Sequence, residues 1–338
     1  MTKKLEELKI VFMGTPEFAV ASLDALVKAG CNIVGVVTAP GKPAGRGMKL
    51  QESAVKKYAL KHAFKILQSE KLKNPEFLEE LKALNADLQV VVAFRMLPEV
   101  VWNMPLMGTI NLHGSLLPQY RGAAPINWAI INGEKETGVT TFKLQHDIDT
   151  GNILLQETIP IDENETAGEL HDRMKDIGAT LLVKTIEGLA EGTLEETPQL
   201  SIDNRQSAID NSQTSESHSQ FTPDSYRDHN SQLKHAPKIF AETCRIHWHK
   251  SIDEIHNLIR GLSPYPAAFA ELGDKTLKVF KSEKEPAVPT SRPGRWETDS
   301  KTYLKFACQN GYMHLKDVQL EGKKRMSVED FLRGYHFR

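Results

Sequence analysis

Cysteine is scarce in this sequence. Cys31, Cys244 and Cys308 are the only three among 338 residues, and they lie far apart. No CxxC pair is present, which argues against a disulfide framework and against a zinc ribbon. Three reduced thiols are typical of a cytoplasmic protein, and we expect that location.

Long apolar runs and an excess of one charge are also absent. No stretch approaches the roughly 18 apolar residues of a membrane span, and "KIVFMG" is too short for a signal-peptide core. The 42 basic residues against 44 acidic ones give a net charge of −2. This balance excludes a general polyanion binder, so any contact with nucleic acid must come from local basic patches.

The pattern that is present indicates an α/β protein long enough for two domains. "LKIVFMG" predicts a buried strand, residues 15–30 predict a helix capped by Thr15, and "CNIVGVVTA" predicts a second strand. This β-α-β opening indicates a parallel sheet covered on both faces. The first strand-to-helix turn has Gly14 alone, so the fingerprint GxGxxG is missing, which argues against a nicotinamide or flavin enzyme.

Composition divides the rest of the chain. Further strands and helices continue to a last helix near residue 192, so we expect a first domain over residues 1–192. Residues 201–232 are mostly Ser, Asp, Asn and Gln, and we interpret residues 193–232 as a polar linker. Short strands with Gly and Pro turns then predict a small β-barrel domain over residues 233–338.

Three polar side chains near predicted strand ends could carry chemistry. Asn111 and His113 end the run "GTINLH", and alternate residues of a strand face one side, so both should reach one pocket at the sheet's carboxyl edge. Asp149, in the polar turn "HDIDTG", can project to the same edge. An amide donor, an imidazole and a carboxylate suffice for acyl transfer to an amine. Each residue also has a purely structural interpretation, as a satisfied histidine or as a side chain that bonds its own turn.

Other catalytic patterns are missing from the sequence. Ser115 does not lie in a GxSxG elbow, which favours direct transfer over a covalent acyl-enzyme. His113 and His146 lack partners at metal-ligand spacing, and "HWH" at 247–249 lacks a third ligand, so no metal site is expected.

Several longer motifs are specific enough to indicate a family. "MGTPEFA", "PAGRG", "NLHGSLLPQYRGAAPINWAI" and "DTGNIL" follow one another in order, and "LKHAPKI" and "EGKKRMSVEDFLRG" continue the pattern toward the C-terminus. Together they resemble the methionyl-tRNA formyltransferase family, although segment 201–232 is longer than the family's usual linker. The resemblance implies a Rossmann-like formyltransferase domain with a parallel-rich sheet, followed by a small C-terminal OB-like barrel.

The resemblance also implies a reaction and its residues. The formyl group of 10-formyltetrahydrofolate would pass to the amino group of initiator methionyl-tRNA in a monomer, with Asn111, His113 and Asp149 as the catalytic residues. The residues implied to bind folate are Phe94, Arg95, Met96, Leu97, Ser115, Leu116, Leu117 and Pro118. The residues implied to bind tRNA are Lys42, Arg46, Lys49, Lys323, Lys324 and Arg325.

Two other functions stay open from the sequence. Formyl transfer to an amino-sugar nucleotide would use the same donor and the same three residues, but would have no use for Arg46 or for residues 323–325. A non-catalytic RNA-binding protein would keep its function without Asn111 and His113. For single residues, Phe94, Met96 and Leu97 could simply be core, and residues 323–325 could be a solvated charged surface.

Overall fold

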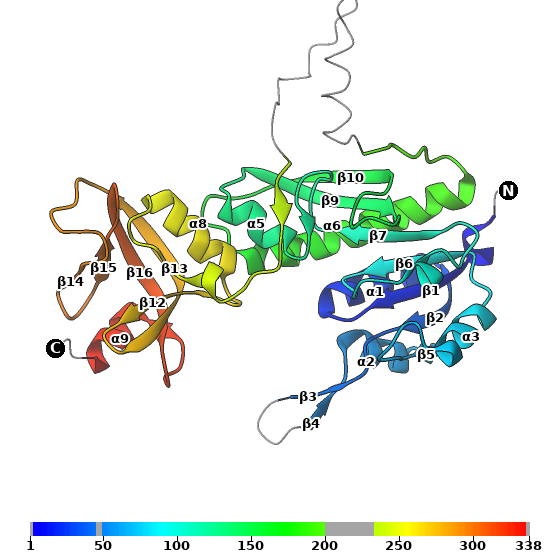
Figure 1. The fold of residues 1–338 in the computed structure, drawn as a ribbon, viewed down its shortest axis with the longest axis horizontal. Coiled ribbons are helices and arrows are strands. Elements are labelled where there is room, and N and C mark those ends of the chain that lie inside the picture. The colour runs from blue at the N-terminus through cyan, green and yellow to red at the C-terminus, as the bar shows by residue number, and fades with distance from the viewer. Residues whose placement is uncertain (1–2, 45–48, 200–232, 336–338) are drawn as a thin grey trace, which may run out of the picture.

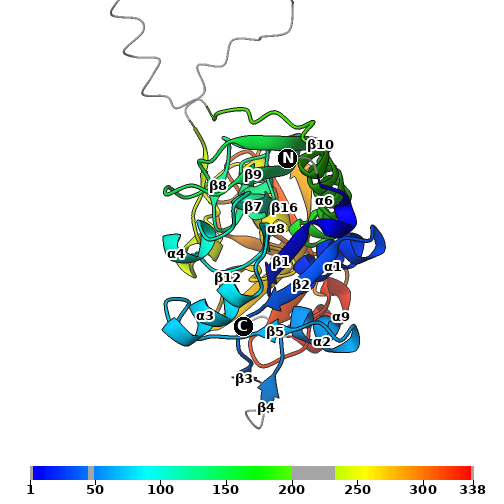
Figure 2. The same cartoon turned by 90° about the vertical axis from the view of Figure 1, so that its right-hand side faces the viewer.

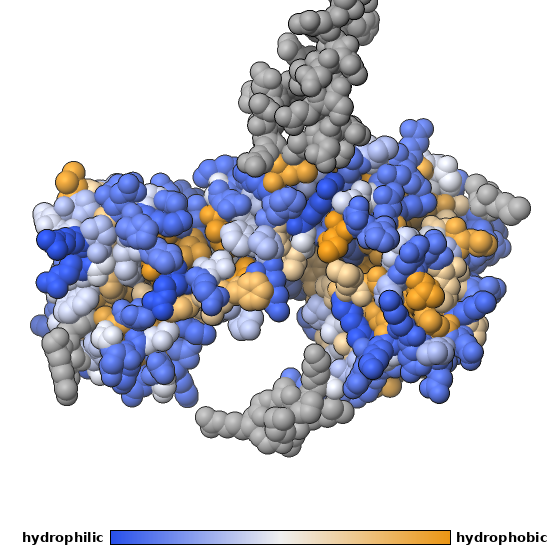
Figure 3. Space-filling view, viewed as in Figure 1, coloured by the Kyte–Doolittle hydropathy of each residue, from blue (hydrophilic) through white to orange (hydrophobic). Residues whose placement is uncertain are grey.

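The computed structural model describes residues 3–44, 49–199 and 233–335. Residues up to 199 form an α/β unit, and residues from about 237 form a smaller unit built mainly from antiparallel strands. The two units lie side by side along the long axis of the molecule (Figure 1). They flank an open concavity in the space-filling view (Figure 3). Among the described helices, none combines the length and the apolar character that a membrane crossing requires.

The main sheet of the N-terminal unit has seven strands. These are β1 (Lys9–Gly14), β2 (Asn32–Val37), β5 (Ile66–Leu67), β6 (Leu88–Val92), β7 (Thr109–His113), β9 (Glu136–Lys143) and β10 (Ile153–Pro160). Their order is β10-β9-β7-β6-β1-β2-β5. The pairs from β5 to β7 are all parallel, whereas β9 is antiparallel to both of its neighbours. The expected parallel-rich sheet is therefore confirmed, with two added strands at one edge.

Helices cover both faces of this sheet, as Figure 2 shows end-on. They are α1 (Glu17–Lys28), α2 (Ala54–Lys61), α3 (Pro75–Ala83), α4 (Glu99–Trp102), α5 (Pro125–Ile131) and α6 (Ala167–Glu191), with a 3-10 turn η1 (Leu5–Glu7) before β1. Alternate residues of β1 supply the two faces. Ile10 and Phe12 join the core beneath α1 and α6, while Val11 and Met13 join the core beneath α3.

The start of α1 differs from the sequence expectation. We expected Thr15 to cap the helix with Pro16 in its first turn, but the helix begins at Glu17, with Pro16 as the extended residue before it and no side-chain cap. Close packing explains the tight turn, because a Cβ at Gly14 would lie 2.6 Å from the Cβ of Ala19. The glycine therefore serves close approach of β1 and α1.

A two-stranded hairpin projects from this unit. Its strands are β3 (Lys42–Ala44) and β4 (Lys49–Gln51), paired antiparallel. Figure 1 shows β3 and β4 extending away from the side of the unit that carries β2 and β5.

The C-terminal unit is a curled antiparallel sheet closed by two helices. Its elements are η2 (Glu242–Cys244), α8 (Ile252–Leu262), β12 (Ala268–Leu272), β13 (Lys275–Pro286), β14 (Trp296–Thr298), β15 (Leu304–Ala307), β16 (Gly311–Leu320), β17 (Met326–Ser327) and α9 (Val328–Gly334). The path of the sheet is β12-β13-β16-β15-β14, and β17 pairs with β16. This is the small barrel-like domain that the sequence predicted. Ser251 caps α8 through the backbone N–H of Glu254, whose carboxylate accepts in return from the backbone N–H of Ser251.

Helix α8 joins the two units. A Cβ at Gly261 would lie 2.6 Å from Cγ1 of Ile131, so α8 passes very close to α5. Asn127 of α5 donates its amide to the carbonyl of Gly261 over 2.7 Å. The buried guanidinium of Arg260 donates to the carbonyls of Asp162 and Glu165, each over 3.2 Å. The units therefore share a packed and hydrogen-bonded interface.

Candidate active site

The carboxyl end of β7 carries Asn111 and His113. Both lie at the sheet position where β7 runs between parallel β6 and antiparallel β9. As alternate residues they face the same side of the sheet, and both line one cavity of about 680 Å³. The pairing of the amide and the imidazole that the sequence suggested is therefore present.

The ring of His113 is fixed by its surroundings. Its Nε2 lies 2.9 Å from the carbonyl oxygen of Tyr120, and Phe142 meets the ring edge-on at 6.4 Å. A carbonyl oxygen can only accept, so Nε2 carries the proton in this contact. In the neutral ring, Nδ1 is then the atom with a free lone pair.

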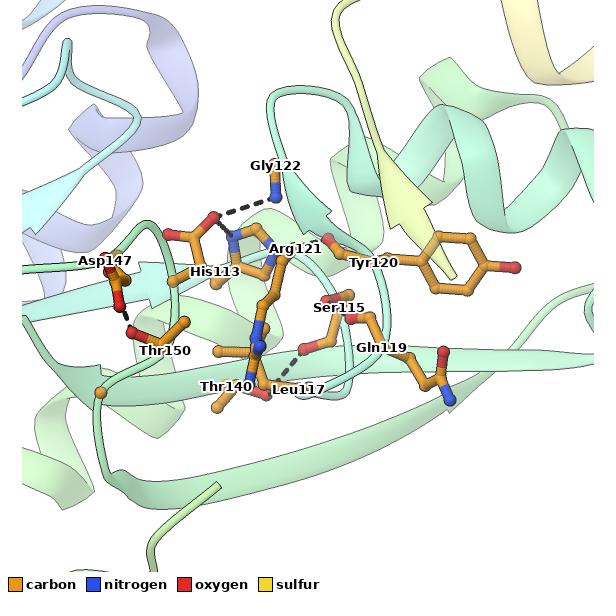
Figure 4. Close-up of polar contacts among 12 residues, drawn as sticks. His113, Ser115, Leu117, Gln119, Tyr120, Arg121, Gly122, Thr140, Asp147 and Thr150 are labelled. Carbon is orange, nitrogen blue, oxygen red and sulfur yellow. Dashed lines mark hydrogen bonds and ion pairs between the residues drawn. The ribbon is translucent and has the colours of Figure 1, made fainter. Parts of the chain in front are cut away.

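Asp149 lies on the turn between β9 and β10, opposite this free nitrogen. Its Oδ2 is 3.8 Å from Nδ1 of His113 and accepts a hydrogen bond from the backbone N–H of Gly122 at 3.0 Å. Figure 4 shows His113 next to Gly122. The backbone of Asp149 is left-handed, with φ of 54°. Asp is one of the few residues besides Gly that adopts this conformation readily. Asn111, His113 and Asp149 thus converge on a single cavity.

The turn that carries Asp149 needs a glycine two residues later. A Cβ at Gly151 would lie 1.6 Å from the carbonyl oxygen of Lys143, so any side chain there would push the two strands apart. The "DTG" motif is therefore explained by close backbone approach as well as by the carboxylate.

One wall of the cavity is the loop after β6. Phe94, Arg95, Met96 and Leu97 all line it, together with the apolar side chains of Val91, Trp102 and Leu144. Leu97 is buried, whereas Met96 is 74% exposed, so Met96 is not core. The guanidinium of Arg95 donates to the carbonyls of Ser69 and Glu70 and lies over the ring of Phe94. Arg95 therefore holds the loop at the rim of the cavity.

The segment 115–118 does not line this cavity. After Gly114 the chain turns toward β9 and β10. There the hydroxyl of Thr140 donates to the carbonyl oxygen of Ser115, and the N–H of Leu117 donates to the oxygen of that hydroxyl. Figure 4 shows Ser115 and Leu117 beside Thr140. Leu116 packs against Gly138 of β9. Residues 115–117 therefore contact β9, a direction that the sequence alone did not reveal.

Other residues of the cavity were not singled out from the sequence. They come from the start of α1, from the turn before α5 and the first residues of α5, and from α6: Pro16, Phe18, Ala123, Ala124, Pro125, Ile126, Asn127 and His171. Residues 123–127 belong to the motif "RGAAPIN", and this motif was the feature of the sequence that could have assigned them to the site. No motif marks His171 and Phe18, because these two residues meet only in the folded chain, where their ring centroids are 5.1 Å apart.

The basic residues proposed for RNA contact occupy two places. Lys42 and Lys49 lie on β3 and β4, and Arg46 falls outside the described residues. Lys323, Lys324 and Arg325 are exposed on the turn between β16 and β17. Arg325 differs from the two lysines, because it donates to Asp317 over 2.8 Å and lies over the ring of Phe280 at 4.3 Å.

Within the described part of the chain, no group of three or more His, Cys, Asp or Glu side chains could hold a metal ion. His247 and His249 have ring centroids 5.6 Å apart. All three cysteines are free and buried.

Both units of the chain match known protein families. The family model for formyl transferase matches residues 8–186, and the model for the formyl transferase C-terminal domain matches residues 238–336. A protein of Bacteroides fragilis named methionyl-tRNA formyltransferase is 48% identical over 338 residues, covering 98% of this chain and 97% of the relative. The chain belongs to the methionyl-tRNA formyltransferase family.

Further relatives agree with this membership. A methionyl-tRNA formyltransferase of Azobacteroides pseudotrichonymphae is 52% identical, covering 96% of this chain and 95% of the relative. A crystal structure of an N-formyltransferase from Helicobacter canadensis, in complex with folinic acid and dTDP-3-aminofucose, aligns with a TM-score of 0.63. It is 21% identical and covers 94% of this chain and 100% of that one, which shows a shared fold. The methionyl-tRNA formyltransferase assignment thus extends over both units of the chain.

Proposed function

We propose that this chain transfers the formyl group of 10-formyltetrahydrofolate to the amino group of initiator methionyl-tRNA, giving N-formylmethionyl-tRNA. The relatives named for that reaction cover almost the whole chain. The observation that carries the catalytic part is the convergence of Asn111, His113 and Asp149 on one cavity.

The shape of the cavity suits the flat donor. One wall presents Phe94, Leu97 and Trp102, and the polar edge presents the three candidate catalytic residues. Ligand sites commonly combine such apolar walls with a few placed polar groups. These apolar walls give residues 94–97 a proposed role in folate binding. The bonds of Ser115 and Leu117 to Thr140 give residues 115–118 a proposed supporting role beside the cavity.

The reaction can be assigned to these side chains step by step. The unprotonated methionine amine attacks the formyl carbon, a C–N bond forms, and charge moves to the formyl oxygen. Asn111 donates its amide to that developing oxyanion, and one such donor is worth on the order of a hundredfold or more in rate. His113 accepts the proton of the attacking amine at Nδ1, the nitrogen that the Tyr120 contact leaves free.

Asp149 completes the assignment. Once Nδ1 is protonated, the carboxylate 3.8 Å away stabilises the imidazolium by charge. The proton then passes to the folate nitrogen as the C–N bond of the donor breaks, so that tetrahydrofolate leaves neutral at that nitrogen. No covalent acyl-enzyme is needed, in line with the absence of an activated serine or cysteine among the cavity residues.

The proposed RNA contacts are electrostatic. Lys42 and Lys49 on the hairpin, Arg46 between them in the sequence, and Lys323, Lys324 and Arg325 on the C-terminal unit would meet the phosphate backbone. Charges there position a nucleic acid without reading its sequence. The proposal takes a single chain as the active form and places the reaction in the cytoplasm, where the charged tRNA is used.

A competition assay tests the proposed function. Purified protein receives 10-formyltetrahydrofolate with methionyl-tRNA and, separately, with an amino-sugar nucleotide, and the formylated amine is identified by mass. We expect formyl-methionine on tRNA and no formylated sugar above the level without enzyme. Formylation of the sugar nucleotide alone would refute the tRNA assignment, and formylation of neither would refute the transferase assignment.

A further inference from the structure

The chain that leaves α6 returns to the candidate active site. After Gly192 ends the helix, Thr197 forms a backbone bridge with Ile153 through two hydrogen bonds of 2.8 Å. Two residues later, Gln199 reaches the turn that carries Asp149. A segment that composition assigned to a linker thus becomes part of the wall behind that turn.

Gln199 uses both ends of its amide. Its Nε2 donates to the carbonyl of Asp149 over 3.1 Å and to the carbonyl of Gly151 over 2.7 Å. Its Oε1 accepts from Nε and Nη2 of Arg121, over 3.0 and 2.6 Å. The guanidinium fixes the orientation of the amide, because only the oxygen can face it.

These contacts close a ring around the catalytic carboxylate. Asp149 bonds through its side chain to the N–H of Gly122, Gly122 follows Arg121 in the chain, Arg121 holds Gln199, and Gln199 holds the backbone of Asp149. Burial lowers the pKa of the Arg121 guanidinium, while the negative charge of Asp149 acts in the opposite direction. Arg121 keeps its charge at neutral pH, so this charge also lies in the field of the carboxylate.

The turn needs such support. Residues 145–148 are all exposed, so little packing holds the tip, and Asp149 itself has a left-handed backbone. Residues in that conformation persist where their surroundings determine them. A shift of about 1 Å at a catalytic group can cost on the order of a hundredfold in rate.

We propose that Gln199 is a positioning residue for Asp149, oriented by Arg121, and that the end of the segment after α6 is therefore a working part of the active site. This inference rests on the proposed function of Asp149. Gln199 touches no reacting atom, so its effect passes through the turn 149–151.

Steady-state kinetics of substitutions at 199 test this inference. For Gln199→Ala we expect kcat to fall about 10- to 100-fold, while KM for folate and for tRNA each change less than about twofold. Gln199→Glu can still accept from Arg121 but cannot donate to the two carbonyls, so we expect a similar loss. Glu195→Ala, on the same segment with an exposed side chain, is the control and should match the parent. A kcat within twofold of the parent in both Gln199 variants would overturn the proposal.

A double-mutant cycle separates positioning from a general structural effect. Asparagine tolerates the backbone of residue 149, so Asp149→Asn removes the charge and keeps the turn. In the Asp149→Asn background we expect Gln199→Ala to cost less than about twofold more, because the group that it positions is gone. Independent, multiplicative losses would refute the positioning role, even if both variants fold. Parent-level kcat in Asp149→Asn alone would instead refute the catalytic role of Asp149, so the two failures are distinguishable.

Discussion

His113 and Tyr120 are joined by a contact that determines the chemistry of the ring: Nε2 of His113 lies 2.9 Å from the carbonyl oxygen of Tyr120. Tyr120 is itself held, because its hydroxyl donates to Glu134, and burial together with this bond raises the pKa of its phenol. A backbone carbonyl can only accept a hydrogen bond, so this contact keeps the proton of the neutral His113 ring on Nε2. The lone pair of Nδ1 is then the one that lies near Asp149.

The first prediction concerns this nitrogen. We expect His113→Ala to lower kcat by about 10²- to 10⁴-fold, the range of a lost general base, with unchanged affinity for methionyl-tRNA. Single-turnover formylation and filter binding measure the two quantities. His62→Ala, which removes a ring stacked on Tyr58 away from the cavity, is the matched control. If turnover of His113→Ala stayed within tenfold of the parent, its assigned role would be wrong.

The second prediction separates the basic residues of the C-terminal unit. Lys323 and Lys324 are exposed, and no ion pair joins either to another described residue, so we expect the double change to Ala to raise KM for tRNA and leave KM for folate unchanged. The slope of log affinity against log salt should fall by about two if both lysines meet phosphates. An unchanged slope would assign these lysines to the solvated surface.

Arg325 gives the contrast within the same turn. It is already paired with Asp317 and stacked on Phe280. We expect Arg325→Ala to lower the thermal midpoint as well as tRNA affinity, whereas the two lysine changes leave the midpoint unaltered. Differential scanning fluorimetry of the three variants decides between these outcomes.

The sequence predicted best those features that depend on a single continuous segment of the chain. The continuous apolar run before Gly14 predicted a buried strand, and two residues at spacing two predicted the shared direction of Asn111 and His113. Asp149 could be assigned to a turn, but its approach to His113 depends on the antiparallel return of β9 and on Gly122, which lies 27 residues away in the chain. Periodicity does not carry such long-range information.

The placement of residues 115–118 and of Gln199 also depends on contacts between segments far apart in the chain. Residues 115–118 follow His113 closely in the chain, yet the bonds of Ser115 and Leu117 to Thr140 hold this segment against β9 and away from the cavity. Gln199 lies in a polar stretch that resembles a linker, and only its bonds to Arg121 and to the Asp149 turn reveal a contact with the site. In both places, tertiary hydrogen bonds decide what local composition leaves open.

The third prediction concerns pH and the interface between the two units. His256 of α8 is 4% exposed and bonded to the hydroxyl of Ser282, and burial, followed by the nearby charges of Arg260 and Lys284, lowers its pKa to about 4. Glu163 acts weakly in the opposite direction. In the unfolded chain a histidine titrates near pH 6.5, as the ordinary value.

The sign of the effect follows from these values. Between about pH 6.5 and 4, His256 is protonated in the unfolded chain but stays neutral in the folded protein. The free energy of unfolding therefore falls as the pH falls through this window. The loss attributable to His256 approaches about 3 kcal/mol at pH 4. Urea unfolding of His256→Gln should show a flatter dependence over this window, while the exposed His247→Gln keeps the parent's. Identical curves for His256→Gln and the parent would refute this explanation.

The fourth prediction concerns the thiols. Burial raises the pKa of Cys31 to about 11 and that of Cys308 to about 12, and it also raises the pKa of Cys244. The thiolate is the reactive form, so at pH 8 only about one Cys308 in ten thousand is reactive at any moment. We expect the folded protein to react with a thiol reagent over hours, and the denatured protein to titrate three thiols within minutes. Rapid labelling of the folded protein would contradict the burial.

One residue ties together both ends of the polar segment. The side chain of Arg121 donates two hydrogen bonds to Gln199. The backbone of Arg121 pairs with His235, because the short strands β8 (Arg121–Gly122) and β11 (His235–Ala236) lie side by side. The chain therefore departs and comes back at a single spot, and Figure 1 shows the two described ends close together. Residues added or removed between these two anchored ends should therefore leave the contacts of Gln199 and His235 with Arg121 in place.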